Sequence, residues 1–162
     1  MKLILTPARA AVTLIALLSI AAGGLAFAQA RNFHALKPQG LFDNPRFAHV
    51  IEVDKGKLIY LSGQAPVDEK GQMVVKGDFK AQSIKTWENV MLALKAAGLD
   101  ASDIIKLNAY VVDLPANMTG YRDARLQFFP PGTPQPASTL IGVSSLALEG
   151  QMIEVEAIAV TR

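Results

Sequence analysis

A long amphipathic run, residues 78–98 (DFKAQSIKTWENVMLALKAAG), constrains the fold of this chain more than any other part of its sequence. Its apolar residues recur at largely helical spacing, and the stripe consists of Phe79, Ile84, Trp87, Met91 and Leu94. Asp78 is placed to cap the start of this helix, and Gly98 is placed to end it. Because a helix with one apolar face must bury that face, the rest of the chain has to supply a partner layer.

Runs rich in β-forming residues surround this helix and predict that layer. They occupy residues 48–53, 57–64, 104–112, 138–143 and 151–160. A shorter second helix is expected over residues 118–129, where Pro130 and Pro131 stop it. The order β-β-α-β-α-β-β indicates an α+β fold, with two helices on one face of a mixed sheet. The segment Asp54-Lys55-Gly56 is compatible with a hairpin turn between the first two strands.

The first thirty residues have the order of a secretory signal peptide. Lys2 and Arg9 precede an apolar run over residues 10–27, and small residues follow, with Ala-x-Ala cleavage sites at 26–28 and 28–30. The alternative is a retained membrane anchor, because the run approaches the length that spans a bilayer. We expect cleavage, a periplasmic or secreted protein, and no membrane contact afterwards. Residues 31–46, punctuated by Pro and Gly, then form an N-terminal arm ahead of one domain, residues 47–162.

Charge and composition exclude several classes of function. Removal of residues 1–30 takes away two of the 16 Lys and Arg and none of the 14 Asp and Glu, so the mature chain carries equal numbers of basic and acidic residues. That balance gives no support to a nucleic-acid partner. The chain has no cysteine, so it has neither disulfides nor a thiol nucleophile. No HExxH motif, CxxC motif or carboxylate-rich calcium loop occurs, so we expect no metal site.

Several motifs then follow one another in a specific order. They are YLSGQAPVDEKG (60–71), AAGLDASDIIKLNAYVVDL (96–114), YRDARLQFF (121–129), PASTLIGV (136–143) and IEVEAIAV (153–160). In this combination the chain resembles the RidA/YjgF family, the reactive intermediate deaminases, over about residues 45–160. The resemblance implies a chorismate-mutase-like fold, a homotrimer, and a small-molecule cleft between neighbouring subunits. For the deaminating members it also implies hydrolysis of imines and enamines without a cofactor.

The sequence departs from the family pattern at the start of the strand expected over residues 138–143. Deaminating members carry an arginine in a PAR sequence that holds the substrate carboxylate, and Ser138 stands there in Pro136-Ala137-Ser138. A hydrogen bond to a charged group contributes about 1.5–3 kcal/mol, so a neutral hydroxyl should bind small imino acids about tenfold to several hundredfold less tightly. The hydroxyls of Ser138 and Thr139 therefore predict an altered substrate range. Leu140 matches the position whose backbone carbonyl faces the ligand.

Other positions transfer from the family with alternatives left open. Glu154 matches the carboxylate that orients water, and strand alternation places Glu156 on the same face; the alternative is that both are solvated glutamates. Gly63 would let a ligand approach the backbone, or it marks a bulge. Phe47 stands where a tyrosine is common. His49, two residues on, points to the same side if the chain is extended, or it is a structural or surface residue.

Three arginines are candidates to replace the missing one, namely Arg46, Arg122 and Arg125. The alternative for Arg122 and Arg125, which lie three residues apart on the second helix, is a solvated face.

Three functions remain open. The first is an exported deaminase of imine or enamine metabolites that uses Glu154 and water. The second is a non-catalytic trimer that binds a small metabolite, and the third is a chaperone-like protein with a vestigial cleft.

Overall fold

A computed structural model describes residues 31–162. The predicted signal peptide, residues 1–30, lies outside this range. The elements are β1 (Phe33–Leu36), β2 (Val50–Val53), β3 (Leu58–Gln64), α1 (Phe79–Ala96), the short 3₁₀ helix η1 (Ala101–Asp103), β4 (Ile104–Val112), α2 (Leu114–Phe128), β5 (Ala137–Val143) and β6 (Ile153–Val160). The expected order is confirmed from β2 onward, and β1 is an additional strand.

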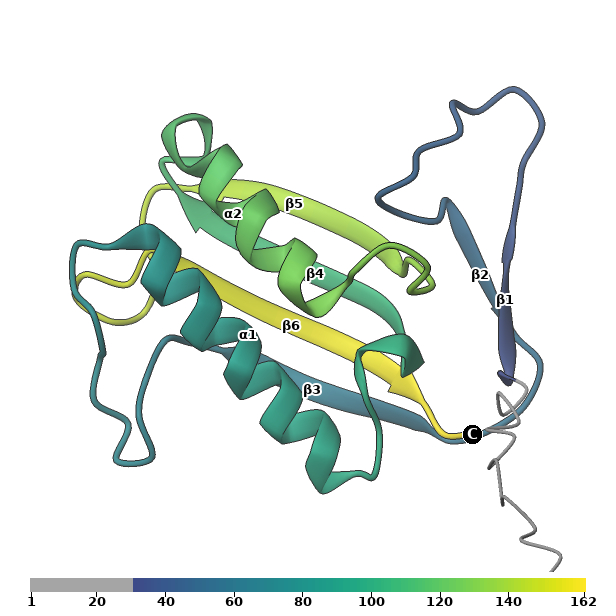
Figure 1. The fold of residues 1–162 in the computed structure, drawn as a ribbon, viewed down its shortest axis with the longest axis horizontal. Coiled ribbons are helices and arrows are strands. Elements are labelled where there is room, and N and C mark those ends of the chain that lie inside the picture. The colour runs from purple at the N-terminus through teal and green to yellow at the C-terminus, as the bar shows by residue number, and fades with distance from the viewer. Residues whose placement is uncertain (1–30) are drawn as a thin grey trace, which may run out of the picture.

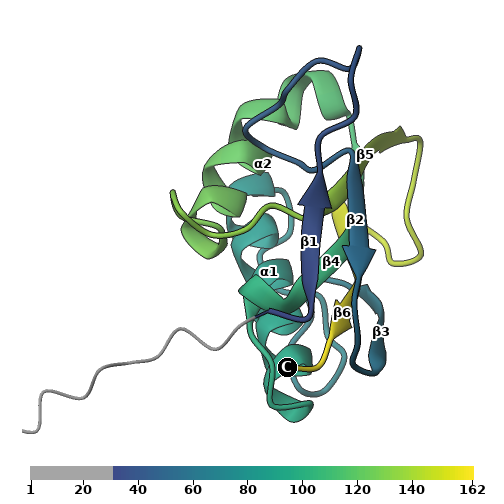
Figure 2. The same ribbon diagram turned by 90° about the vertical axis from the view of Figure 1, so that its right-hand side faces the viewer.

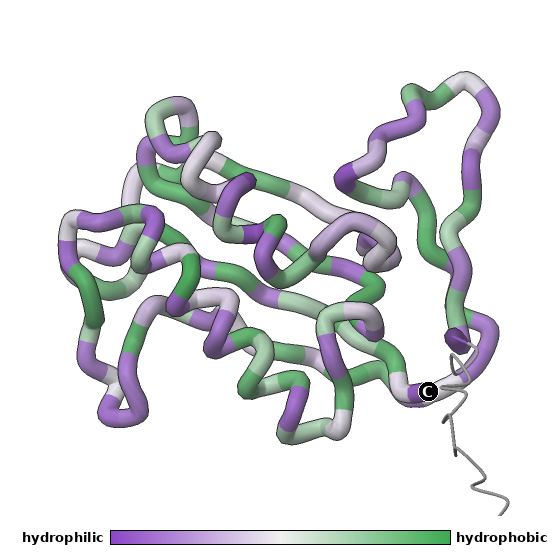
Figure 3. Tube along the Cα trace, viewed as in Figure 1, coloured by the Kyte–Doolittle hydropathy of each residue, from purple (hydrophilic) through white to green (hydrophobic). Residues whose placement is uncertain are grey.

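Four strands form the central sheet in the order β3-β6-β4-β5 (Figure 1). β6 pairs antiparallel with both β3 and β4, whereas β4 and β5 are parallel. A parallel pair needs a crossover connection, and α2 supplies it between β4 and β5. The sheet is therefore mixed, as predicted. Figure 3 shows hydrophobic and hydrophilic residues following one another along the central strands, as expected for a sheet with different environments on its two faces.

Both helices cover the same face of this sheet, which we call the helix face (Figures 1 and 2). The predicted ends of α1 are confirmed, because the Asp78 carboxylate accepts a hydrogen bond from the Ala81 amide at 3.0 Å and Gly98 adopts a left-handed φ of +72°. Trp87 has no exposed surface and lies 6.1 Å and 5.6 Å, between ring centroids, from Phe128 and Phe129. These aromatic contacts fix the two helices against each other.

The second helix is longer than expected. It begins at Leu114, four residues before the predicted start, and Pro115 occupies its first turn. Proline is well suited to that place because its fixed φ matches a helix and its missing N–H has no partner there in any case. The predicted end at Pro130 is confirmed to within one or two residues.

The predicted hairpin between residues 48–53 and 57–64 is wrong. β2 pairs instead with β1, in a separate two-stranded antiparallel sheet, and β3 pairs with β6. Asp54-Lys55-Gly56 carries the chain from one sheet to the other, and Gly56 has a φ of +104°. A side chain on Gly56 would collide with the carbonyl oxygen of Thr161, so glycine is required by both conformation and space.

The smaller sheet stands at one end of the larger one (Figure 1). Phe33 of β1 is buried with Ile105 and Val160, on the face of the central sheet that α1 and α2 do not cover. We call this the open face. Residues 31–46 thus contain a strand packed on the domain, and the rest of that arm runs on to the bridge between Ala48 and Ala137.

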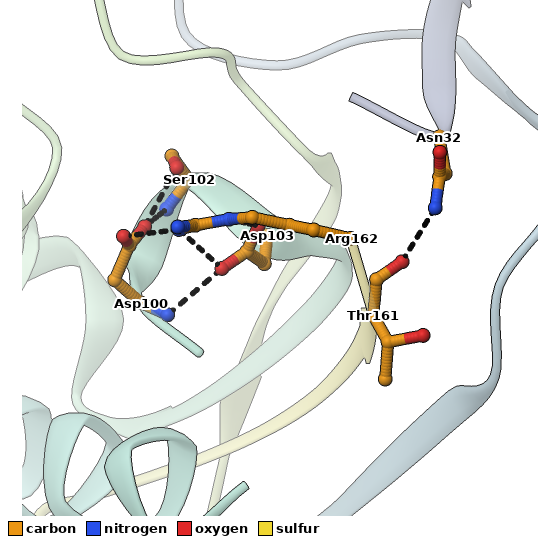
Figure 4. A network of polar contacts seen from close by, with 6 residues as sticks. All are labelled: Asn32, Asp100, Ser102, Asp103, Thr161 and Arg162. Atoms are coloured by element: carbon orange, nitrogen blue, oxygen red, sulfur yellow. Dashed lines mark hydrogen bonds and ion pairs between the residues drawn. The ribbon is translucent and has the colours of Figure 1, made fainter. Parts of the chain in front are cut away.

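The C-terminus is fixed by charge (Figure 4). Arg162 donates from Nε and Nη2 to the two carboxylate oxygens of Asp103, each at 2.8 Å, and also contacts Asp100. Asp103 is almost fully buried, so Arg162 supplies the positive charge that such a carboxylate needs. Nearby, the Asn32 side-chain amide donates to the Thr161 carbonyl at 2.9 Å, which joins the start of β1 to the end of the chain.

Candidate functional site

Two glutamates of β6 project from the open face of the sheet. The burial of β6 alternates from residue to residue, with Ile153, Val155 and Ala157 buried on the helix face and Glu154 and Glu156 only half-buried. Glu154 pairs with Tyr110 of β4, and Glu156 pairs with Asn108. The predicted placement of the two carboxylates on one face is therefore confirmed.

Glu154 is held between a glycine and a glutamine. The Gln151 amide donates to Glu154 Oε2 at 3.0 Å, and Gln151 is itself buried. Gly63 of β3 lies beneath the carboxylate, where a Cβ atom would come within 2.8 Å of Glu154 Cδ. β3 also shifts its register against β6 between Leu61 and Gln64, so Gly63 lies in a bulge. The alternative interpretation of Gly63 as a bulge is confirmed, and the glycine also makes room for Glu154.

Glu156 has different partners, and both of them bond to its Oε1 atom. Asn108 donates to Glu156 Oε1 at 2.7 Å, and the Tyr110 hydroxyl donates to the same atom at 2.9 Å. The hydrogen bond from Tyr110 raises the pKa of that phenol, since ionisation would put a phenolate beside a carboxylate. Glu156 therefore organises Asn108 and Tyr110 through its Oε1 atom, whereas Glu154 Oε1 accepts no side-chain hydrogen bond within residues 31–162.

The residues of β5 alternate between the two faces. Ser138 pairs with Leu107, which is fully buried on the helix face, and Ser138 and Leu140 line a pocket beside α2. Thr139 pairs with Asn108 on the open face, and its hydroxyl accepts a hydrogen bond from Lys106 Nζ at 2.7 Å. The Ser138-Thr139 hydroxyl pair is therefore divided, and only Ser138 faces the pocket.

This pocket, which we call the α2 pocket, has a volume of about 470 Å³. It lies between α2, the start of β5 and residues 44–47, and its walls are largely apolar. The apolar contributions come from Phe47, Met118, Tyr121, Leu126 and Leu140. Its size and lining fall in the range of small-molecule sites, in which a few polar groups orient a ligand against apolar walls.

Three arginines line the same pocket, namely Arg46, Arg122 and Arg125. The prediction of a solvated face is wrong for Arg125, because its guanidinium packs 4.7 Å from the Phe129 ring centroid and donates from Nη2 to Gln135 Oε1 at 2.9 Å. Arg122 is exposed, as expected. Arg125 lies one helical turn after the buried Tyr121, and that spacing was the sequence signal for its inward orientation.

Burial lowers the pKa of the Arg125 guanidinium, and the nearby charge of Arg46 acts in the same direction. Burial likewise raises the pKa of Tyr121 to about 12. Within residues 31–162 none of the three pocket arginines forms an ion pair. A partly buried guanidinium without an anionic partner is unusual, because removal of the charge from water is costly unless another charge compensates for it.

His49 is separated from the α2 pocket. It is exposed and lines a neighbouring hollow beneath residues 35–45, where its Nε2 contacts the Phe42 carbonyl oxygen at 2.6 Å. Its ring packs edge-on against Phe47, with centroids 5.2 Å apart. Phe47 itself contributes to both hollows. These contacts favour the structural interpretation of His49 over the alternative of a residue that touches ligand.

The predicted site residues thus form two groups in one chain. Phe47, Ser138 and Leu140 lie on the helix face at the α2 pocket, whereas Glu154 and Gly63 lie on the open face. Ser138 pairs with Leu107 of β4, and Leu107 pairs in turn with Ala157 of β6. Ser138 is therefore also displaced from Glu154 along the direction of the strands. The two groups do not meet within a single copy of the chain.

Within residues 31–162, no helix is both long enough and apolar enough to cross a bilayer. The same residues contain no group of three or more His, Asp or Glu side chains arranged to hold a metal ion.

Comparison with known proteins gives a consistent result. Residues 43–161 match the family model Ribonuc_L-PSP, described as Endoribonuclease L-PSP. The chain is 37% identical over 114 residues to the 2-iminobutanoate/2-iminopropanoate deaminase of Salmonella typhimurium, covering 70% of this chain and 88% of the relative. Two solved structures are also similar. YyfB of the conserved Rid protein family from Yersinia pestis has a TM-score of 0.72 at 28% identity, covering 80% of this chain and 99% of its own. E. coli TdcF with bound serine has a TM-score of 0.58 at 30% identity, covering 72% and 93%.

Proposed function

The chain belongs to the Ribonuc_L-PSP (RidA/YjgF) family, and we propose that it hydrolyses the C=N bond of imine metabolites with Glu154 as the residue that handles water. In this reaction, water adds to the imine carbon, which forms a C–O bond and gives a carbinolamine. Transfer of a proton from oxygen to nitrogen then lets the C–N bond break. The products are a carbonyl compound and ammonia, and the overall balance requires only water.

One observation carries this proposal: the environment of Glu154. Its carboxylate is half-buried, is fixed from one side by Gln151, and occupies the space that the missing side chain of Gly63 leaves. A general base must be held within hydrogen-bond reach of the water that it activates, and such a residue contributes about 10²- to 10⁴-fold to a rate. Glu156 differs because its Oε1 atom accepts hydrogen bonds from two neighbouring side chains, Asn108 and Tyr110, which a water activated at that atom would have to displace.

We further propose that the working site lies between neighbouring copies of the chain in a homotrimer. The open-face carboxylate of one copy would meet the α2 pocket of the next, which brings together residues that are far apart in a single copy. Exposed apolar side chains on the open face favour association, since Tyr60 is 72% exposed and Ile141 is 37% exposed there. Light scattering on the purified protein tests this directly, and a monomer at working concentrations would contradict it.

Ser138 in place of the family's arginine supports an altered substrate range, because a hydroxyl cannot neutralise a carboxylate. The relative from Salmonella is named for two small 2-imino acids, 2-iminopropanoate and 2-iminobutanoate. We propose that this chain acts on other imines or enamines, without a cofactor and without a nucleic-acid partner. We also propose that residues 1–30 direct it to the periplasm or outside the cell before they are removed.

The decisive experiment follows imine lifetime. An amino-acid dehydratase generates the imine, a trapping amine reports how much remains, and the purified protein is added in increasing amounts. We expect the imine to decay faster with the wild type, and about 10² times less effectively with Glu154→Gln. Glu69→Gln, which changes an exposed loop carboxylate, is the matched control and should behave as the wild type.

No acceleration by the wild type across a series of imines would overturn the deaminase proposal. In that case the α2 pocket would support a metabolite-binding protein. Such a protein is recognised by thermal shift, because a ligand that binds only the folded state raises its stability.

A further inference from the structure

The α2 pocket already contains positive charge that position 138 lacks. Arg46, Arg122 and Arg125 surround it against a single acidic residue, Asp123. Arg125 reaches it from α2, the helix that faces β5 across the pocket. Its Nε atom is buried and has no hydrogen-bond partner among the described residues, and its Nη2 bonds only to the neutral Gln135. The guanidinium is therefore held in place without being neutralised.

We propose that Arg125, assisted by Arg122 and Arg46, anchors the carboxylate of the ligand in place of the arginine that position 138 would otherwise provide. This inference rests on the proposed function for the identity of the reaction, but it concerns which residues bind and which substrates fit. A guanidinium presents paired N–H donors that match a carboxylate, and such charge-assisted bonds are about twice as strong as neutral ones. A ligand anion would also relieve the repulsion between Arg125 and Arg46.

The shape of the pocket assigns the rest of the ligand. Phe47, Met118, Leu126 and Leu140 present apolar surface around a volume of about 470 Å³, far more than a methyl or ethyl side chain would fill. A small ligand would leave this apolar surface in contact with water and gain no binding free energy from it. A bulky apolar side chain would cover it, and each Å² buried contributes about 25 cal/mol. The pocket therefore suits a 2-imino or 2-oxo acid with a large apolar or aromatic side chain, whose carboxylate points to α2 and whose side chain lies along Phe47 and Leu140.

Three stable compounds separate these features by calorimetry. Phenylpyruvate carries both the carboxylate and an aromatic side chain, phenylacetone lacks the carboxylate, and pyruvate lacks the aromatic ring. We expect the affinity of the wild type for phenylpyruvate to be at least about tenfold higher than its affinity for phenylacetone or for pyruvate. Arg125→Gln should weaken phenylpyruvate about 10- to 100-fold and leave phenylacetone nearly unchanged. Arg31→Gln, an exposed arginine outside the pocket, is the matched control.

Because Arg125 also packs on Phe129, its removal can disturb α2, so a second set of variants is needed. Ser138→Arg is introduced alone and together with Arg125→Gln. If Arg125 holds the carboxylate, Ser138→Arg gives no gain in affinity for phenylpyruvate in the wild type, where it adds a fourth guanidinium to the pocket. In the Arg125→Gln background the same substitution restores most of the lost affinity.

Two results would overturn the inference. One is equal binding of phenylpyruvate and phenylacetone to the wild type. The other is a gain of affinity from Ser138→Arg in the wild type that is as large as in Arg125→Gln. Failure of the proposed function is recognised separately. A protein that binds phenylpyruvate through Arg125 but hydrolyses no imine keeps the inference and loses the reaction, whereas imine hydrolysis with a KM unaffected by Arg125→Gln keeps the reaction and loses the inference.

Discussion

The Glu154 carboxylate occupies the space that a side chain on Gly63 would need. A Cβ atom at position 63 would lie 2.8 Å from Glu154 Cδ and closer still to Oε1. β3 and β6 are neighbours in the sheet, so this contact crosses two strands that are far apart in the sequence. The position of the proposed water-handling residue therefore depends on the absence of a methyl group on another strand.

Gly63→Ala should remove most of the activity while leaving the fold intact. The colliding atoms belong to the end of a flexible side chain, so Glu154 can rotate away at small cost to stability, but it then no longer holds water in place. We expect imine hydrolysis to fall about 10²-fold, as for Glu154→Gln, with a small change in Tm. Ser62→Ala, at an exposed position on the same strand, should change neither quantity. Full activity in Gly63→Ala would contradict the role given to Glu154.

Glu156→Gln should lower the pKa of the Tyr110 phenol toward its ordinary value near 10. The carboxylate of Glu156 raises that pKa through its hydrogen bond and its charge, and the amide of Gln keeps an acceptor oxygen without the charge. NMR with tyrosine labelled at Cζ follows this ionisation as pH rises. The pKa of the buried Tyr121, raised to about 12 by burial, is the internal control and should not move. An unchanged titration of Tyr110 would show that another group controls it.

Arg162→Gln should destabilise the fold at neutral pH and less so in acid. It leaves the buried Asp103 carboxylate without its cationic partner, for which a cost of about 3 kcal/mol is expected. Burial acts to raise the pKa of Asp100, but hydrogen bonds from Ser102 and Arg162 outweigh it and lower that pKa below 3.8.

A carboxyl whose folded pKa is lowered contributes stability above its unfolded pKa, and that contribution is lost as pH falls through the folded value. Urea unfolding of wild type and Arg162→Gln at pH 7 and at pH 3 measures the difference. We expect the free energies of unfolding to differ more at pH 7 than at pH 3. The matched control is Arg31→Gln, which should match the wild type at both pH values. An equal difference at both pH values would mean that the cost of Arg162→Gln comes from packing.

Gln82→Met should lower stability and activity together. Gln82 is fully buried in α1, where its amide donates to the Gly150 carbonyl at 2.9 Å and its Oε1 accepts from the Met152 amide at 2.9 Å. Methionine has a similar volume but leaves both groups unpaired, at about 1–3 kcal/mol each. Gln151, which orients Glu154, lies between those two groups, so imine hydrolysis should also fall. Lys80→Met, on the exposed side of α1, is the control and should change neither quantity. Full imine hydrolysis by a destabilised Gln82→Met would show that the orientation of Glu154 does not depend on Gln82.

Local patterns predicted some elements closely. The ends of α1 follow from Asp78 and Gly98, and β4 runs over Ile104–Val112 as its β-rich run indicated. Both depend on residues within one segment. The pairing of β2 with β1 could not be read in this way, because strand partners are chosen by packing between distant segments, and the four residues of β1 are too few to show a period.

The site was predictable to a similar extent. Alternation along β6 placed Glu154 and Glu156 on one face without knowledge of the partners. It did not reveal that Glu156 is occupied by Asn108 and Tyr110, which depends on the register of β4 against β6. Only the resemblance to the family points to Ser138. The inward position of Arg125 had a local signal, its spacing from Tyr121, but only the packing of α2 over β5 shows that it lines the same pocket as Ser138.

The placement of Ser138 and Glu154 on opposite faces of one sheet has a genetic consequence. If the site forms between copies, a chain that is defective at Glu154 still offers an intact α2 pocket, and a chain that is defective at Arg125 still offers an intact carboxylate. Two inactive alleles of this kind, expressed in the same cell, would therefore complement each other through mixed assemblies, whereas two alleles that damage the same face would not.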